Sequence, residues 1–156
     1  MNRRYTIDEY KSLFYKLKKK IPGVSITTDI IVGFPNETAD DFKKTLEIYN
    51  ELKYDLAYTF IYSPRNGTPA ALIKDEISLE EKEARLHTLN QIVNRYAREA
   101  NQKYLYKTVP VLIEGPSEKN NKVMGYTDTM KLVNVEADLS YVGKIVPVLI
   151  TEVKTW

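Results

Sequence analysis

The first sixty residues alternate between a helical pattern of apolar positions and short, nearly continuous apolar runs. Thr6 and Glu9 form a capping box, and the apolar residues that follow recur every three or four positions, which predicts an amphipathic helix over residues 7–20. The segment VSITTDIIVGF (24–34) has the almost continuous apolar end expected of a strand covered on both faces. Thr38 can cap a second helix, and DLAYTFIYS (55–63) reads as the next strand. This alternation with short connections predicts an α/β architecture.

A third helix is predicted from Ser78 and Glu81, which form another capping box, to about Tyr104. Its apolar stripe is typical of a helix packed on a core. The stripe consists of Leu86, Leu89, Val93, Tyr96 and Ala100.

Beyond Tyr106 the pattern changes to short strands separated by turn residues. KTVPVLI (107–113) and KIVPVLI (144–150) nearly repeat, and Pro110 and Pro147 each predict a sheet edge or a bulge. This pattern predicts a small antiparallel barrel of OB-like character. We therefore expect an α/β domain over residues 1–97 and a small all-β domain over residues 98–156.

Composition restricts the chemistry that this chain can perform. The chain has 156 residues, a formal charge of +2, no cysteine and one histidine, His87. Disulfides, thiolate zinc sites, cysteine-ligated clusters and cysteine nucleophiles within the chain are therefore excluded. His87 falls in the middle of the third helix and is expected at the surface. We nominate no catalytic residue and no metal ligand.

The chain shows no targeting or membrane signal. No apolar run approaches the roughly 20 residues of a membrane helix, and the first residues lack a signal-peptide core. A cytoplasmic location without membrane partners is the default expectation.

Two loops stand where ligands bind in α/β sheets, at the C-terminal ends of the strands: GFPNET (33–38) and SPRNGTPAA (63–71). Gly33 would let the backbone approach a ligand, and Arg65 could bind a carboxylate or phosphate with two hydrogen bonds. Neither signal is specific. A surface ion pair is the alternative for Arg65, and a cap or structural hydrogen bond is the alternative for Asp29 and Glu37.

Lysines and aromatic residues alternate in the C-terminal strands, a combination that single-stranded RNA-binding barrels use for phosphate contacts and base stacking. Acidic residues nearly balance these lysines, so binding requires that the charges be sorted onto different faces. The candidate RNA-binding residues are Lys107, Lys122, Tyr126, Lys131, Lys144 and Lys154.

Several segments, in this order, resemble the C-terminal half of the radical-SAM methylthiotransferases. They are MNRRYT, TTDIIVGFP, FIYSPRNGTPAA, VLIEGPSEK and KTW. VLIEGPSEKN and EVKTW favour the branch that modifies tRNA. The resemblance implies that residues 1–97 are the end of a partial β/α radical-SAM barrel and that residues 98–156 are a TRAM domain.

In that family, S-adenosylmethionine is cleaved at a 4Fe–4S cluster held by three cysteines earlier in the barrel, and a second 4Fe–4S cluster takes part in sulfur insertion. The resemblance places Ile31, Gly33 and Phe34 at the adenine of the cofactor, with Tyr62, Ser63 and Arg65 at the last barrel strand beside it. Arg3 is implied to pair with the cofactor carboxylate or to organise the site. In the TRAM part, Tyr126 and Met130 replace an arginine and an asparagine that relatives often carry.

The resulting expectation is a C-terminal fragment of an enzyme that adds a 2-methylthio group to N6-isopentenyladenosine next to the anticodon. Its expected partners are the tRNA anticodon arm and the remaining N-terminal domains, and we expect no turnover from the fragment alone. Two alternatives remain open: a stand-alone RNA-binding protein, and a fragment of the methylthiotransferase that modifies ribosomal protein S12.

Overall fold

The computed structural model describes residues 3–118 and 122–155, and the chain divides into two compact units, residues 1–97 and 98–156. Three of the segments that carry the resemblance extend outside the described residues: MNRRYT with residues 1–2, VLIEGPSEKN with residues 119–120 and KTW with residue 156. Each unit has its own buried core, so each is described by itself.

Unit 1 contains α1 (Ile7–Lys20), β1 (Thr27–Val32), α2 (Ala39–Leu52), β2 (Leu56–Ile61), a 3-10 turn η1 (Pro69–Leu72) and most of α3 (Leu79–Gln102). The predicted starts of all three helices are confirmed. Capping boxes begin α1 at Thr6 and α2 at Thr38, and the Ser78 hydroxyl accepts from the N–H of Glu81 at 3.1 Å. Each cap satisfies N–H groups that a helix start leaves without partners.

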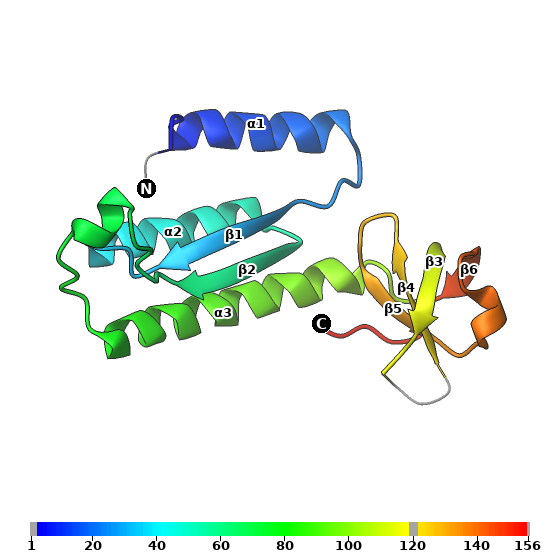
Figure 1. The fold of residues 1–156 in the computed structure, drawn as a ribbon. Coiled ribbons are helices and arrows are strands. Elements are labelled where there is room, and N and C mark those ends of the chain that lie inside the picture. The colour runs from blue at the N-terminus through cyan, green and yellow to red at the C-terminus, as the bar shows by residue number, and fades with distance from the viewer. Residues whose placement is uncertain (1–2, 119–121, 156) are drawn as a thin grey trace. The chain divides into compact units, whose positions relative to one another are not determined.

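β1 and β2 pair in parallel from Thr27–Leu56 to Val32–Ile61, and Figure 1 shows their arrowheads pointing the same way. One face of this sheet joins α1, α2 and α3 in a core around Phe14, Val32, Tyr49 and Leu89. The opposite face is open, since Tyr58 is 56% exposed and Phe60 is 51% exposed. Thr27 and Asp29 of β1 are exposed as well, so the prediction that the strand over residues 24–34 is buried on both faces is wrong for this chain.

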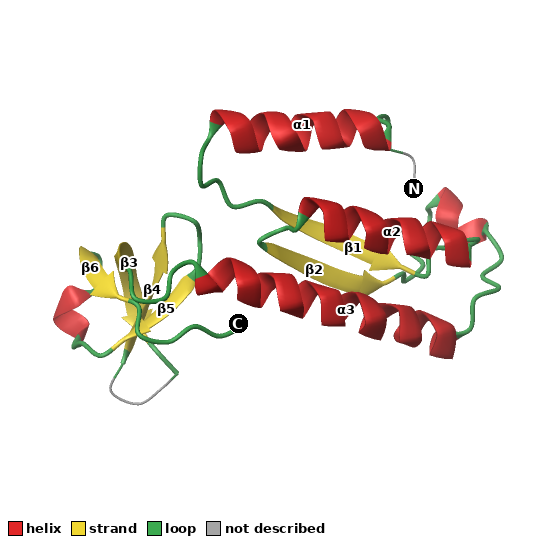
Figure 2. Ribbon diagram, turned by 180° about the vertical axis from the view of Figure 1, so that it is seen from behind, coloured by secondary structure: helices red, strands yellow, loops and turns green. Residues whose placement is uncertain are grey.

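Unit 2 contains β3 (Thr108–Pro116), β4 (Val123–Thr127), β5 (Leu132–Val135), a 3-10 turn η2 (Leu139–Tyr141) and β6 (Ile145–Leu149). The strands form an antiparallel sheet in the order β5-β4-β3-β6, drawn in yellow in Figure 2. The core is formed by Val111, Ile113 and Val123. The structure confirms the prediction of a small antiparallel all-β unit.

The two near-identical segments pair with each other, which places Pro110 directly opposite Pro147. Neither proline has an N–H group, so the two can face each other only at a position without a ladder hydrogen bond. Pro147 lies in an edge strand, as predicted. Pro110 lies in the central strand β3, and the bulge falls between Ile113 and Gly115 instead. β4 pairing begins only at Val111, so Pro110 interrupts no ladder on that side.

Candidate cofactor edge and nucleic-acid interface

The C-terminal ends of β1 and β2 bring together three of the predicted cofactor residues. The N–H of Tyr62 donates to the carbonyl of Val32 at 2.9 Å, which extends the parallel pairing by one step. The rings of Phe34 and Tyr62 meet edge to face, with centroids 5.0 Å apart. Ile31 is paired with Phe60 and shares the open face of the sheet. The result is an aromatic and aliphatic edge of the kind that an adenine ring can stack on.

Gly33 has a different neighbour from the one that the sequence predicts. It adopts the left-handed conformation, with φ of 69°, and an added Cβ would lie 2.5 Å from Cγ of Lys82. Its N–H donates to Oε1 of Glu37 at 3.2 Å. The space beside the Cα of Gly33 is filled by Lys82 of α3, and its N–H group is bonded to Glu37. The backbone at Gly33 therefore closely approaches helix α3 and not an open space for a ligand.

A buried ionic cluster fixes the loop that follows β1. The Arg85 guanidinium donates from Nη1 to Oε1 of Glu37 at 2.7 Å and to its carbonyl oxygen at 3.0 Å, and from Nε to Glu81 at 2.9 Å. The side chains of Arg85 and Glu37 are only 8% and 12% exposed. Burial alone would lower the pKa of Arg85, but its hydrogen bonds to Glu37 and Glu81 outweigh that effect and raise the pKa above its ordinary value. Glu37 therefore makes structural hydrogen bonds, which is the alternative that the sequence left open for this residue.

Lys82 lies beside this cluster and is 7% exposed. Its ammonium group is paired with Asp75, and that hydrogen bond is the main cause of the lowered pKa of the Asp75 carboxyl. Sequence analysis missed Lys82 and Arg85. The signal was available, because the two cations continue the buried stripe of Leu89, Val93 and Ala97 toward the start of α3.

Ser63 and Arg65 lie in the loop after β2, and both are exposed. The carbonyl of Arg65 accepts from the N–H and hydroxyl of Thr68, at 3.2 and 2.8 Å, which shapes the turn. The hydroxyl of Tyr62 is buried without a hydrogen-bond partner among the described residues. The loop thus carries an exposed serine and an exposed arginine directly after Tyr62 in the chain.

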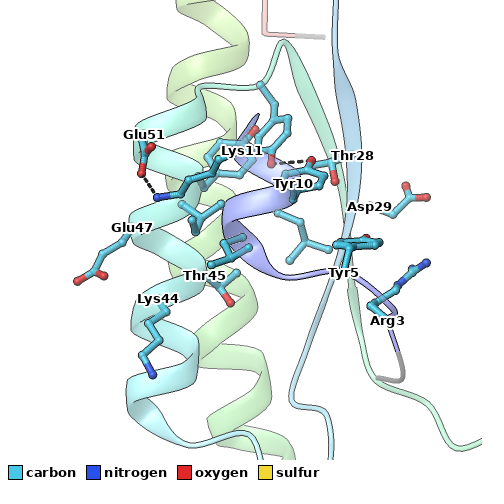
Figure 3. A pocket seen from close by; sticks show the side chains of 15 residues that line it. Arg3, Tyr5, Tyr10, Lys11, Thr28, Asp29, Lys44, Thr45, Glu47 and Glu51 are labelled. Atoms are coloured by element: carbon cyan, nitrogen blue, oxygen red, sulfur yellow. Dashed lines mark hydrogen bonds and ion pairs between the residues drawn. The ribbon is translucent and has the colours of Figure 1, made fainter. Parts of the chain in front are cut away.

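Arg3 lies elsewhere in unit 1. It lines a cavity of about 530 Å³ beside the middle of β1, between α1 and α2, together with Tyr5, Thr28 and Asp29. Figure 3 shows this cavity, with hydrogen bonds from Lys11 to Glu51 and between Tyr10 and Tyr54. The structure therefore does not bring Arg3 together with the strand-end residues.

The candidate RNA-binding residues of unit 2 are divided among three places: the outer face of the sheet, the start of β6 and one end of the sheet. Tyr126 lies on the outer face of the sheet, in a cross-strand row with Leu132 and Leu112. Lys122, on the same strand face, is paired with Glu136 at 3.0 Å. Lys144 lies at the edge strand, with its ammonium group 5.5 Å from the centre of the Tyr141 ring.

The other three candidates gather at one end of the sheet. Lys107 is backbone-paired with Ile150, and Lys131 with Thr127. The carbonyl of Lys154 accepts from the side-chain amide of Asn101 at 2.7 Å. The loop that contains Lys131 reaches the segment between α3 and β3 through Thr129, whose hydroxyl bonds to that of Tyr104 at 2.7 Å, so the three lysines lie in segments that meet there.

The described residues contain no candidate metal-binding cluster. Within residues 3–118 and 122–155, no cluster of three or more histidine and acidic residues could hold a metal ion. In the same part of the chain, no helix is both long and apolar enough to cross a membrane. His87 is exposed on α3 and bonded to Gln91 at 3.0 Å, as expected of a surface residue.

Comparison with known proteins finds relatives of the second unit and of the whole chain. Residues 102–156 match the family model of the TRAM domain. The entire chain is 53%, 50% and 51% identical to tRNA-2-methylthio-N(6)-dimethylallyladenosine synthases of Bacillus cytotoxicus, Bacillus mycoides and Bacillus cereus, covering 31% of each. The chain thus spans about a third of the length of these curated relatives. Along its whole length the chain is therefore similar to the C-terminal part of the tRNA-2-methylthio-N(6)-dimethylallyladenosine synthases, and it includes a TRAM domain.

Proposed function

We propose that the chain is the RNA-binding and cofactor-edge portion of a radical-SAM methylthiotransferase that adds a 2-methylthio group to N6-dimethylallyladenosine next to the anticodon of tRNA. The observation that carries this proposal is the identity of about half of all residues, along the whole chain, with synthases of that name. The TRAM domain supplies the RNA-binding module. We further propose that residues 1–97 are the end of the β/α barrel of this enzyme. Residues 98–156 would then be its TRAM domain.

The residues at the strand ends fit one side of an S-adenosylmethionine site. Ile31, Phe34 and Tyr62 offer apolar and aromatic surface for the adenine, and Ser63 and Arg65 offer polar groups for the amino acid end. When bound in the complete enzyme, the cofactor would supply the radical that abstracts hydrogen from the adenosine ring. The backbone of Gly33 fits this role less well, because its N–H is bonded to Glu37. Arg3 would act from the neighbouring cavity, not at the strand ends.

The chain has no cysteine, so it offers no thiolate ligand for an iron–sulfur cluster. The two 4Fe–4S clusters would therefore be held by other parts of the enzyme, which are the proposed protein partners of this chain. We expect the purified chain to produce no 2-methylthio product. Turnover by the chain alone would contradict this expectation.

The proposed RNA function is tested by titrating the isotope-labelled chain with a tRNA anticodon stem-loop and following amide NMR shifts. We expect saturable shifts confined to residues 98–156, weaker at about 200 mM salt than at about 50 mM because phosphate contacts release counterions. Equal affinity for a random RNA would favour the ribosomal-protein enzyme. The absence of shifts would contradict RNA binding by this chain.

The cofactor edge requires its own test, because RNA binding says nothing about it. Titration with S-adenosylmethionine at millimolar concentration should shift the amides of Ile31, Phe34 and Tyr62. A Phe34→Ala variant should weaken these shifts, and a variant of the exposed Tyr15 on α1 should leave them unchanged. Shifts centred on Arg3 and Tyr5 instead would place the cofactor in the other cavity.

A further inference from the structure

One end of unit 2 is built from three segments that are distant in sequence: the turn 103–107, the hairpin loop 128–131 and the C-terminal segment 150–155. We call it the basic end. The hydroxyls of Tyr104 and Thr129 bond to each other at 2.7 Å, which attaches the hairpin loop to the turn. The N–H of Tyr106 donates to the carbonyl of Ile150 at 2.8 Å, which attaches the C-terminal segment. The three segments therefore form one fixed surface.

The basic end has an excess of positive charge. It contains four lysines and two carboxylates. The lysines are Lys103, Lys107, Lys131 and Lys154, and the carboxylates are Asp128 and Glu152. One carboxylate, Glu152, is paired with Lys154 at 3.4 Å. The formal charge of the three segments is therefore +2, the sign that attracts the phosphates of an RNA.

The outer face of the sheet differs in its electrostatics. Its candidate cation, Lys122, is paired with Glu136 at 3.0 Å, and its candidate ring, Tyr126, is half-buried between Leu112 and Leu132. A ring enclosed by neighbours on its own sheet has little area left for a base. Among the described residues, the outer face thus offers a paired cation and a partly covered ring, which suit single-stranded RNA recognition less well than an open ring beside lysines.

Tyr106 provides an open ring at the basic end. Its side chain is 76% exposed, and Met130, in the hairpin loop of the basic end, is 72% exposed. The N–H of Tyr106 is bonded to Ile150, so the residue is held by its backbone while its ring is left to solvent. Stacking of a nucleobase on an aromatic ring beside phosphate-binding lysines is the usual chemistry of sequence-tolerant RNA binding.

We propose that the basic end, and not the outer face of the sheet, is the surface that binds the unpaired loop of an RNA, with Tyr106 stacking on a base and Lys107 contacting a phosphate. This assignment rests on the proposed RNA-binding function and names its site. Tyr106 was not among the residues that the sequence nominated, and Tyr126 and Lys122 lose their proposed direct roles.

The test is the affinity of the full chain for a fluorescent tRNA anticodon stem-loop, measured by anisotropy in two matched pairs of variants. Tyr106→Asn removes the ring and keeps a residue that tolerates the left-handed backbone, where φ is 59°. Tyr126→Thr removes the other ring and keeps a strand-forming residue. Lys107→Gln and Lys122→Gln form the second pair. Tyr106→Phe keeps the stacking ring and should bind like the unaltered chain.

We expect Tyr106→Asn to weaken binding about 10-fold, within the range measured for single base–aromatic stacks, and Tyr126→Thr to change it less than about 2-fold. Lys107→Gln should lower the slope of log affinity against log salt by about 0.7, the value for one phosphate contact on a single strand, and Lys122→Gln should not. Weakening by the Tyr126 and Lys122 variants, or equal effects of both pairs, would overturn the assignment and leave RNA binding intact. If the unaltered chain shows no saturable binding, the proposed function itself fails. Circular dichroism of each variant verifies that it is folded.

Discussion

Replacement of Arg85 by methionine tests whether the buried ionic cluster holds the loop after β1. Arg85→Met removes the guanidinium that bonds to the carboxylate and carbonyl of Glu37 and leaves an apolar side chain of similar length. Glu37 then keeps one hydrogen bond, from the N–H of Gly33 at 3.2 Å. A carboxylate that is 12% exposed would remain without its countercharge.

The magnitude follows from this burial. Breaking a buried ion pair by removing one partner costs about 3–5 kcal/mol, because the remaining charge is left desolvated. The remaining Gly33 bond and the limited water access place the expected cost at the lower end, about 3 kcal/mol. For a unit of this size a urea m-value of about 1.5 kcal/mol per M converts that cost to a midpoint lowered by about 2 M.

The assay is urea unfolding followed by circular dichroism at the helical minimum, which reports unit 1 because α1, α2 and most of α3 lie there. Glu81→Gln is the matched control, since Glu81 is 52% exposed and its pair with Arg85 should contribute less than about 1 kcal/mol. The double variant Arg85→Met with Glu37→Met should recover most of the loss, because no buried charge remains unpaired. A single Arg85→Met variant within about 1 kcal/mol of the unaltered chain would refute the reasoning.

Three further predictions concern single groups. Gly125→Ala should unfold unit 2, with loss of its dispersed amide NMR signals, because an added Cβ would lie 2.1 Å from the carbonyl oxygen of Leu112 on the adjacent strand; a folded unit 2 would contradict it. Tyr49→Phe should leave the urea midpoint unchanged or raise it, because the buried hydroxyl has no partner among the described residues. Tyr54→Phe should lower the free energy of unfolding by about 1 kcal/mol, because it removes a hydroxyl that is bonded to Tyr10. The side-chain hydrogen bond from Thr38 lowers the pKa of Asp41 below its ordinary value of 3.8. The contribution of the ionised Asp41 to stability is therefore complete above pH 3.8 and is lost as the pH falls through the lowered pKa. Between about pH 6 and 2.5, the urea midpoint of Asp41→Asn should therefore fall less steeply than that of the unaltered chain.

The sequence by itself determined the local elements of this protein. Capping boxes at Thr6 and Thr38 and the spacing of apolar residues locate the helices, because caps and helical periodicity depend on residues within one or two turns. The alternation of strands and turn residues beyond Tyr106 likewise predicts the antiparallel unit, since strand pairing between neighbours needs only short connections. The absence of cysteine excludes cluster ligation within the chain without reference to any fold.

The tertiary structure alone decided which residues meet. Gly33 lies against Lys82, and Arg85 reaches Glu37 across 48 positions, because the packing of α3 on the sheet brings them together. Pro110 is tolerated in a central strand because β4 begins to pair one residue later. Tyr104 and Thr129, and Tyr106 and Ile150, are brought together across 25 and 44 positions by the folding of unit 2, which the pattern of any one segment does not predict. Pattern within one segment carries no information on such contacts, which arise only when distant segments fold onto each other.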